Sequence, residues 1–339
     1  MNGEDGPDLS EALDTVERYL LGNAPTLTRV QVCEQAGVPL EVAEELWRQL
    51  GFPHQPDDAV AFTQADVEAL EHTHDLVELG ILSQDRQAAL VRTWGRSFAR
   101  LAEWQTRLLT DVALESADPV QQVADLASEV LPRVEALQGY VWRRHLASAG
   151  NRLLASDSAG SDTSPLAAVF VDIVGFTSRS KELTESELVQ WIEYFESECS
   201  GLVVDHGGRV IKNIGDEVLF VADDASRAAD AALVMTARGS DPDDDFPEVR
   251  AGLAYGEVVS RLGDVFGPTV NIAARLTSVA RPGSVLIDRG AHDALTGRTD
   301  DSDDPGDEHE HTDFSFRRMR RTSVKGYSRL QSWVLKRSG

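Results

Sequence analysis

The chain has 339 residues, with 57 acidic against 32 basic side chains and a formal net charge of −25. At roughly 100 to 200 residues per domain, this length predicts two domains that can each bury a core. Hydrophobic residues make up 42% of the chain, which excludes a disordered protein. The acidic balance argues against binding to nucleic acid or anionic lipid, because both need a basic face. Small-molecule and protein partners are therefore favoured.

The cysteine content and the first residues bear on the compartment. Cys33 and Cys199 are too few for a disulfide framework, which indicates a reducing environment. The charged side chains of residues 1–10 are all acidic, so no signal peptide is expected. No stretch approaches the roughly 18 uninterrupted apolar residues that span a bilayer. We expect a cytoplasmic protein without integral membrane association.

Residues 1–148 have the sequence pattern of a helical domain. Capping residues predict where its helices begin, and glycines predict where they end. Between residues 120 and 146 apolar side chains recur at threes and fours, which predicts a long amphipathic helix that Pro132 should kink or break. The small, polar residues 149–165 predict a linker. The expected helix starts are Thr28, Thr63, Ser83 and Asp118, and the expected stops are Gly37, Gly51 and Gly80.

Two features of the helical domain suggest functions that compete. Residues 27–52, LTRVQVCEQAGVPLEVAEELWRQLGF, look somewhat like the helix-turn-helix start of MerR-type regulators. However, residues 40–50 offer only Arg48 against three glutamates, so we expect no DNA binding. His72 and His74 raise the hypothesis of a proton effector, because imidazole titrates near neutrality. A lipid or small-molecule effector is equally open.

After residue 165 the pattern changes to strands that alternate with helices, which predicts an α/β or α+β sheet domain. Thr184 with Glu187 forms a capping box that should open one helix. Gly215 and Asp216 suit the tight turn of a hairpin. The acidic run 300–310 is expected to be a solvated loop. The expected strands are 166–171, 209–214, 217–221, 249–254, 256–260, 284–287 and 332–335.

Two aspartates stand where strands are expected to end. Asp172 follows a buried strand, and Gly175 allows the next backbone segment to approach a ligand, so that its amides could cradle phosphates. Asp216 lies in the predicted hairpin turn. Two carboxylates on neighbouring strand ends suit magnesium, which prefers oxygen ligands. The alternative for Asp216, taken alone, is an ordinary turn residue.

Polar residues also mark a later helix. Gly267 and Pro268 are expected to open it, and Asn271 and Arg275 lie four residues apart on one face. Taken alone, Arg275 fits a salt-bridge partner as well as a phosphate-binding residue. Lys325 precedes a glycine in the segment SVKGYSRL, close to a late strand.

Three segments in this order, FVDIVGFT, IKNIGDEVLF and DVFGPTVNIAARL, resemble the catalytic domain of class III nucleotidyl cyclases. The resemblance implies an α+β chain, in which an all-helical regulatory domain (1–148) and a linker (149–165) precede the cyclase domain (166–336). The cyclase domain is expected to be an α/β sandwich with a ferredoxin-like palm. The arrangement resembles soluble actinobacterial adenylyl cyclases with an autoregulatory domain.

The resemblance also implies roles for individual residues. Asp172 and Asp216, with the carbonyl of Ile173, would bind two Mg²⁺ or Mn²⁺ ions per site. Lys212 and Asp264 match the pair that reads adenine. The remaining expected roles are ribose positioning by Asn271, transition-state stabilisation by Arg275, and phosphate binding by Gly175, Phe176, Thr177 and Lys325.

The expected function is an adenylate cyclase that converts ATP into 3′,5′-cyclic AMP and pyrophosphate by two-metal-ion catalysis. By the resemblance, its sites lie between the subunits of a head-to-tail homodimer, and the N-terminal domain regulates the rate. The alternative is a catalytically silent, cyclase-like interaction module or signalling regulator. A diguanylate cyclase is not expected, because the Gly-Gly-(Asp/Glu)-Glu-Phe signature is absent.

Overall fold

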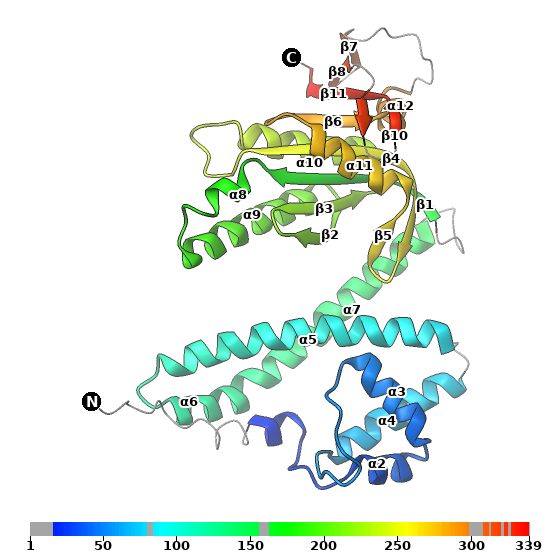
Figure 1. Ribbon diagram of the computed structural model, residues 1–339, viewed down its shortest axis with the longest axis vertical. Helices are drawn as coiled ribbons and strands as arrows, with labels where there is room; N and C mark the ends of the chain where they lie inside the picture. Colours follow the sequence, from blue (N-terminus) through cyan, green and yellow to red (C-terminus); the bar gives the residue numbers. More distant parts are fainter. Residues whose placement is uncertain are drawn as a thin grey trace. The chain divides into compact units, whose positions relative to one another are not determined.

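The computed structural model describes residues 16–79, 84–155, 163–297, 308–311, 313–319, 322–324 and 327–338. The chain divides into two compact units, Met1–Ala155 and Ser156–Gly339 (Figure 1). The described part of the first unit is helical, and the second combines a mixed sheet with helices. The expected α+β class is therefore confirmed. Among the residues described, no helix is long and apolar enough to cross a membrane.

Three short helices form a small core in the first unit: α2 (Arg29–Ala36), α3 (Leu40–Leu50) and α4 (Gln64–Glu78). The buried Arg29 joins α2 to α3 and to the following loop, through Glu44 at 2.7 Å and through Asp57. An ion pair with an acid on each element fixes their arrangement. The core side chains are Val32, Cys33, Val38, Ala43, Val67 and Leu70.

The expected boundaries of these helices are confirmed where the structure describes them. Capping boxes form at Thr28 and Thr63, in which each threonine and the side chain three residues later satisfy free backbone amides. Gly37 and Gly51 end α2 and α3 in the left-handed conformation, which favours glycine. The expected start at Ser83 and stop at Gly80 lie outside the described residues.

Longer helices follow, α5 (Gln84–Leu114), α6 (Pro119–Asp125) and α7 (Leu131–Ala155), with a π-helical turn, η1 (Leu126–Val130), between the last two. The expected N-cap at Asp118 is present, since its side chain accepts a hydrogen bond from the amide of Gln121 at 3.1 Å. The amide of Leu131 bonds to the carbonyl of Leu126, five residues back. Pro132 comes next and has no amide to donate, so the helical ladder is interrupted where the sequence predicts it.

The linker expected at 149–165 is shorter than predicted. Helix α7 continues to Ala155, and strand β1 begins at Thr163. The last turns of α7 contain Arg152, whose guanidinium donates to the hydroxyl of Ser148 at 2.7 Å. Pairing with a neighbouring strand fixes Thr163 and Ser164 in β1 despite their polar, turn-like composition. Tertiary contacts outweigh local preference at this end.

The second unit contains a nine-stranded sheet in which β1 lies near the centre. The order is β2-β3-β1-β4-β6-β11-β8-β7, with β5 paired to β4. All pairs are antiparallel except β4 with β6. A separate hairpin joins β9 (Thr322–Val324) and β10 (Tyr327–Leu330). The strands of the sheet are β1 (Thr163–Ile173), β2 (Arg209–Ile214), β3 (Glu217–Ala222), β4 (Val249–Arg261), β5 (Asp264–Phe266), β6 (Val285–Asp288), β7 (Glu308–His311), β8 (Phe314–Arg318) and β11 (Ser332–Arg337).

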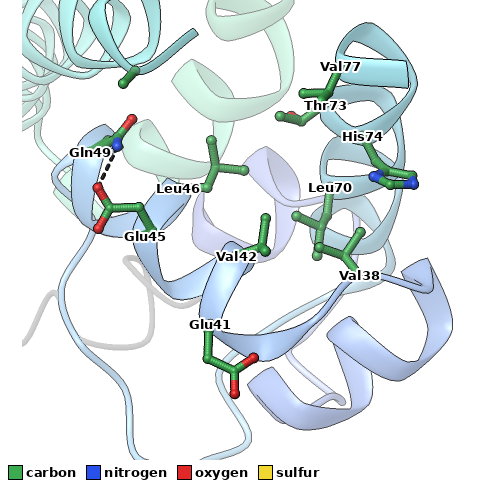
Figure 2. Close-up of a pocket in the computed structure, with 11 residues that line it drawn as sticks. Val38, Glu41, Val42, Glu45, Leu46, Gln49, Leu70, Thr73, His74 and Val77 are labelled. Carbon is green, nitrogen blue, oxygen red and sulfur yellow. Dashed lines mark hydrogen bonds between the residues drawn. The ribbon is translucent and has the colours of Figure 1, made fainter. Parts of the chain in front are cut away.

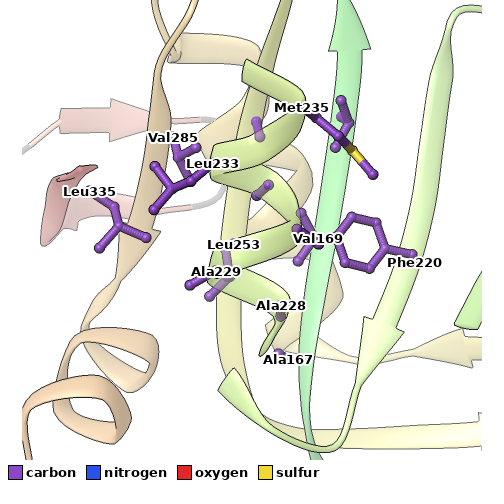
Figure 3. Close-up of a cluster of buried hydrophobic side chains, with 14 of the residues drawn as sticks. Ala167, Val169, Phe220, Ala228, Ala229, Leu233, Met235, Leu253, Val285 and Leu335 are labelled. Atoms are coloured by element: carbon purple, nitrogen blue, oxygen red, sulfur yellow. The ribbon is translucent and has the colours of Figure 1, made fainter. Parts of the chain in front are cut away.

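The first four strands and two helices form the ferredoxin-like palm that the resemblance implies. Helix α9 (Glu185–Asp205) follows β1 and the short helix α8 (Phe176–Arg179), and α10 (Ala225–Arg238) follows β3, which gives a βαββαβ order. The capping box of Thr184 and Glu187 opens α9 as expected. Small alanines on α10 let this helix pack closely on the sheet, as Figure 3 shows for Ala228 and Ala229. Helix α12 (Arg289–Thr296) adds Ala291 and Leu295 to this core.

Two expectations about the sheet need correction. Residues 249–254 and 256–260 form the single strand β4, because β1 pairs with it without a break from Val249 to Val259. The acidic run 300–310 is not entirely loop, because residues 308–310 belong to β7, where pairing with β8 supplies backbone hydrogen bonds. Neither partner strand can be identified from local composition.

Candidate active site

The alternation of side chains along β1 shows which face of the sheet carries the candidate site. Leu166, Ala168 and Phe170 pack in one core cluster with residues of α11 (Pro268–Val279), whereas the odd-numbered residues face α9 and α10. Since side chains alternate between the two faces of a strand, Asp172 continues the α11 side. Its side chain is 16% exposed. The strand thus carries this carboxylate to the edge of a buried surface.

A hairpin brings a second acid to the same place. Asp216 lies in the two-residue turn between β2 and β3, where Gly215 has a φ of 66° that favours glycine. The amide of Ile173 donates to the carbonyl of Asp216 at 3.1 Å. Asp172 pairs in register with Glu217, the residue after Asp216. The structure therefore brings together Asp172, Ile173 and Asp216, the three residues expected at the metal site.

Two acids beside Asp172 have a raised pKa. Burial, followed by repulsion from Asp172, raises the pKa of the Glu217 carboxyl to about 7. Burial is also the main cause that raises the pKa of Asp216, and Asp172 contributes. The sequence analysis did not include Glu217 among the site residues, although its position beside Asp216 was a usable signal. Three neighbouring acids form a negative centre that favours a bound cation.

Arg250 on β4 is a second residue that the sequence analysis missed. Its Nε donates to Oδ2 of Asp172 at 2.7 Å, its Nη2 forms an ion pair with the same oxygen at 2.6 Å, and its Nη1 donates to the Ser278 carbonyl at 3.4 Å. Asp172 and Arg250 are also register partners across β1 and β4. This arginine partly neutralises the acids and joins them to the end of α11. A single base at the start of an apolar strand, in VRAGLA, was the only sequence signal.

The donor set fits magnesium or manganese bound together with a substrate. Within the described ranges, no three His, Cys, Asp or Glu side chains converge into a group that could hold a metal by themselves. Magnesium is commonly held by one or two carboxylates, with water and substrate phosphates completing its shell. Asp172 and Asp216 beside the backbone of Ile173 match that pattern. A divalent ion would neutralise the combined negative charge of these acids and so relieve their repulsion.

Lys212 and Asp264, the expected adenine-reading pair, contact each other directly. The ammonium of Lys212 lies 2.9 Å from Oδ1 and 2.6 Å from Oδ2 of Asp264. A β-bulge between Val210 and Lys212 puts Lys212 opposite Leu219, on the α11 side of the sheet. Both side chains are partly exposed, at 40% and 32%. An ammonium and a carboxylate side by side form a donor and acceptor pair at the surface.

Helix α11 carries the two remaining polar residues. The helix lies so close to the sheet that a Cβ at Gly252 would be only 2.4 Å from the Ala273 carbonyl oxygen. Glycine at position 252 makes this approach possible. Thr277 donates its hydroxyl to the Phe170 carbonyl at 3.3 Å, which ties α11 to β1. Asn271 is exposed and Arg275 is half-buried. Neither side chain forms a hydrogen bond or ion pair with another residue in the described part of the chain.

The turn after β1 contains the expected phosphate-binding residues. Gly175 has a φ of 72°, and the ring of Phe176 stacks on Trp191 of α9 with centroids 5.7 Å apart. The exposed Thr177 follows in the first turn of α8, where a helix has no acceptors for its own amides. The expected lysine, Lys325, lies outside the described residues, between β9 and β10.

We expect Arg250→Gln to lower the free energy of unfolding of the metal-free protein by about 1–2 kcal/mol, because it removes charge-assisted bonds to a partly exposed acid. Added Mn²⁺ should restore much of this loss, since it supplies the missing positive charge. Urea unfolding with EDTA and with Mn²⁺ measures both effects. Arg209→Gln is the control, because Arg209 pairs with Asp223 at 3.5 Å away from the acids. An equal Mn²⁺ response in both variants would contradict the assignment.

Comparison with known families matches both units. Residues 160–337 match the adenylate and guanylate cyclase catalytic domain, and residues 9–146 match the adenylate cyclase regulatory domain. The chain belongs to the class III nucleotidyl cyclases. Within that family it is an adenylate cyclase with an N-terminal regulatory domain, as the following relatives show.

An adenylate cyclase of Streptomyces coelicolor is 37% identical over 95% of this chain and 89% of its own length. An adenylate cyclase of Glutamicibacter nicotianae is 35% identical over 96% of this chain and 82% of its own. Among solved structures, the adenylyl cyclase CyaB from P. aeruginosa matches 52% of this chain and 96% of that chain, with 23% identity and a TM-score of 0.41.

Proposed function

We propose that this chain converts ATP into 3′,5′-cyclic AMP and pyrophosphate at sites shared between two copies of itself. The observation that carries the proposal is the presence, on one sheet face, of an acidic centre at Asp172 and Asp216 and of a Lys212–Asp264 pair. The first suits a metal-bound triphosphate, and the second suits a nucleobase edge. Family membership makes cyclisation the reaction that uses both.

Asp172, Asp216 and the carbonyl of Ile173 would hold two Mg²⁺ or Mn²⁺ ions. When bound, such ions lower the pKa of the ribose 3′-hydroxyl and steady the departing pyrophosphate. Gly175 and the amides of Phe176 and Thr177 would accommodate the phosphates beside these acids. The stack of Phe176 on Trp191 would keep that turn in place.

Three cationic or polar side chains would act on the reacting groups. Asn271 would position the ribose, and Arg275 would donate hydrogen bonds to the phosphoryl group as its negative charge grows. Lys325 would contact the phosphates as a more mobile charge. Arg250 stands next to Asp172 and would add positive charge at the triphosphate end of the site.

Adenine would be read by the Lys212–Asp264 pair. The Lys212 ammonium can donate to N1 of the base, and the Asp264 carboxylate can accept from the exocyclic amine. Guanine presents the opposite polarity at these edges, so a guanine would leave both groups unpaired. Their mutual contact in the structure keeps them at one place on the sheet.

The dimer would complete each site with residues from both subunits. The acids and the base-reading pair are two separate groups on this chain, since Arg250 contacts Asp172 in the first and Lys212 contacts Asp264 in the second. Asn271 and Arg275 have no polar partner within the described chain. We infer that one subunit supplies the acids and its partner supplies the base-reading pair and α11. Two equivalent sites then form by symmetry.

The direct test is incubation of the purified chain with ATP and Mg²⁺ or Mn²⁺, followed by measurement of cyclic AMP. Turnover that depends on metal and grows with dimer content supports the proposal. A folded, dimeric protein without cyclic AMP formation would favour the alternative, a silent interaction module. GTP in place of ATP serves as the substrate control.

We expect the double variant Lys212→Glu, Asp264→Cys to lose the preference for ATP over GTP by at least about tenfold, because the hydrogen-bond polarity at the base edge is altered. The ratio of kcat/KM for the two nucleotides measures this. Lys181→Glu is the charge-matched control, since Lys181 is exposed after α8. An unchanged ratio in the double variant would show that other residues read the base.

Regulation by the N-terminal unit is the second part of the proposal. Helix α7 is the last element of that unit before β1 in the chain, and it follows the π-helical turn η1, a kind of irregularity that is frequent at functional sites. Small energetic biases in such a segment would alter how the dimer closes and therefore its rate.

The cysteines bear on the compartment. Cys33 and Cys199 are buried free thiols, which suits a reducing compartment. We therefore place the enzyme in the cytoplasm.

We expect a shortened chain that begins at Ser161 to produce cyclic AMP faster than the full chain at equal dimer content, because we infer that the N-terminal unit restrains closure of the catalytic dimer. Rates are compared from about pH 5.5 to 8.5, which brackets the ordinary histidine pKa of about 6.5. Vesicles of anionic lipid are the second variable. Superimposable rates under all conditions would leave the N-terminal unit as a tether or docking module.

A further inference from the structure

The helical unit contains a cavity of about 450 Å³ between α3 and α4, which we call the α3–α4 pocket (Figure 2). Figure 2 shows Val42 and Leu46 of α3 opposite Leu70 and Val77 of α4. The eleven residues that line it are Val38, Glu41, Val42, Glu45, Leu46, Gln49, Leu70, Thr73, His74, Val77 and Ala88.

The volume and the apolar lining of the pocket are typical of a small-molecule site. Such sites commonly measure about 300–1,000 Å³ and combine apolar walls with a few polar groups. Val38 and Leu70 form a buried part of the wall, at 5% and 3% exposure. Val42, which also lines the pocket, is apolar but 56% exposed. An apolar group in the pocket would remove this surface from water.

The charges at the rim indicate which head group the ligand carries. Among the described residues that line the pocket, two are acids and none is lysine or arginine. Glu45 is already paired, because Arg48 and Gln49 donate to its carboxylate and lower its pKa. The side chain of Glu41 has no hydrogen bond or ion pair with any residue in the described ranges. Its exposed carboxylate is the group that remains available to a cation.

Arg92 of α5 also acts electrostatically on Glu45, the acid that Arg48 already pairs, so Glu41 remains the available acid. The hydroxyl of Thr73 donates to the Ala69 carbonyl at 2.8 Å, within its own helix. The His74 ring lies 3.4 Å from the Glu78 carboxylate, so another acid stands beside this side of the pocket. The described charges around the pocket therefore leave the Glu41 carboxylate uncompensated.

We propose that the α3–α4 pocket binds a small amphipathic cation, with its apolar body between α3 and α4 and its ammonium group beside Glu41. The proposal concerns binding to the helical unit and stands independently of the cyclase reaction. It also assigns a use to α3, whose acidic residues argue against the DNA contact that the MerR-type likeness suggested.

The test uses the full chain and three probes with one apolar body: 4-phenylbutylammonium, 4-phenylbutanol and 4-phenylbutanoate. At pH 7.5 the first is a cation and the last an anion, because amines and carboxylic acids titrate far from this pH. Calorimetric titration and ligand-observed NMR measure the affinities. We expect the order ammonium, alcohol, carboxylate. Equal affinities, a preference for the carboxylate, or no saturable binding of any probe would overturn the proposal.

Two variants locate the site. Val42→Trp should fill the pocket and weaken all three probes at least about tenfold, and the exposure of residue 42 makes loss of folding avoidable. Glu41→Gln should weaken the ammonium probe about two- to fivefold and leave the alcohol unchanged, which is the size of a surface ion pair. Glu34→Gln is the matched control, an exposed acid on α2 outside the pocket. Unchanged binding in Val42→Trp, or equal effects of the two glutamate variants, would refute the site.

Discussion

Asp172→Ala and Asp216→Ala are each expected to reduce cyclic AMP formation at least about 1,000-fold, because each removes a carboxylate that, in the proposed site, would hold the metal ions beside the triphosphate. The fold should survive. Asp216 lies in a half-buried turn, where burial, with a smaller contribution from Asp172, raises its pKa, so loss of its carboxylate relieves an unfavourable charge. Asp172 has one strong partner, Arg250, and contributes no apolar packing.

Circular dichroism and the Mn²⁺-dependent rise in Tm separate a lost metal site from a lost fold. The wild type should gain Tm with Mn²⁺, since a ligand that binds only the native state stabilises it. Both variants should lose that gain and keep their secondary structure. Asp223→Ala is the control, an acid near the end of β3 that pairs with Arg209. Full activity of either variant would refute the two-metal assignment.

An equimolar mixture of Asp172→Ala and Arg275→Ala is expected to recover about one quarter of wild-type activity, although each variant alone is inactive. Random pairing makes half of the dimers mixed, and one of the two sites in each mixed dimer receives intact residues from both chains. No gain is expected if every site is built within one subunit. The experiment therefore tests the shared site itself.

The controls for this mixture are its concentration dependence and a chain with both substitutions. Dilution below the dimer dissociation constant should abolish the recovered activity. The chain with both Asp172→Ala and Arg275→Ala should recover nothing when mixed with itself. If mass spectrometry finds mixed dimers but the mixture remains inactive, the division of residues between subunits is wrong.

Local features of the sequence determine a large part of this fold. Capping residues act on backbone amides only three positions away, which is why Thr28, Thr63 and Thr184 begin helices as predicted. Pro132 interrupts its helix through its own missing amide. The motif around Asp172 and the hairpin at Gly215 also depend on short segments, so the pattern predicts them directly.

Regions without capping residues, prolines or turn motifs were predicted less well. The division of β4 at Tyr255 was wrong, and the linker was too long at both ends. In each case the decisive contact is pairing with a strand or the continuation of a helix, which local composition does not report. The same holds for β7, whose acidic residues gain order from β8.

By itself, the sequence determined the order of the two units, the acids at strand ends and the family to which three short segments belong. Only the tertiary structure decided that Arg250 bonds to Asp172, 78 residues away, and that Lys212 meets Asp264 across 52 residues. The α3–α4 pocket likewise exists only when Val42 and Leu70 face each other. The physical reason is range: hydrogen-bond caps and turns act over a few residues, whereas these charge pairs and cavities depend on strand register and helix packing.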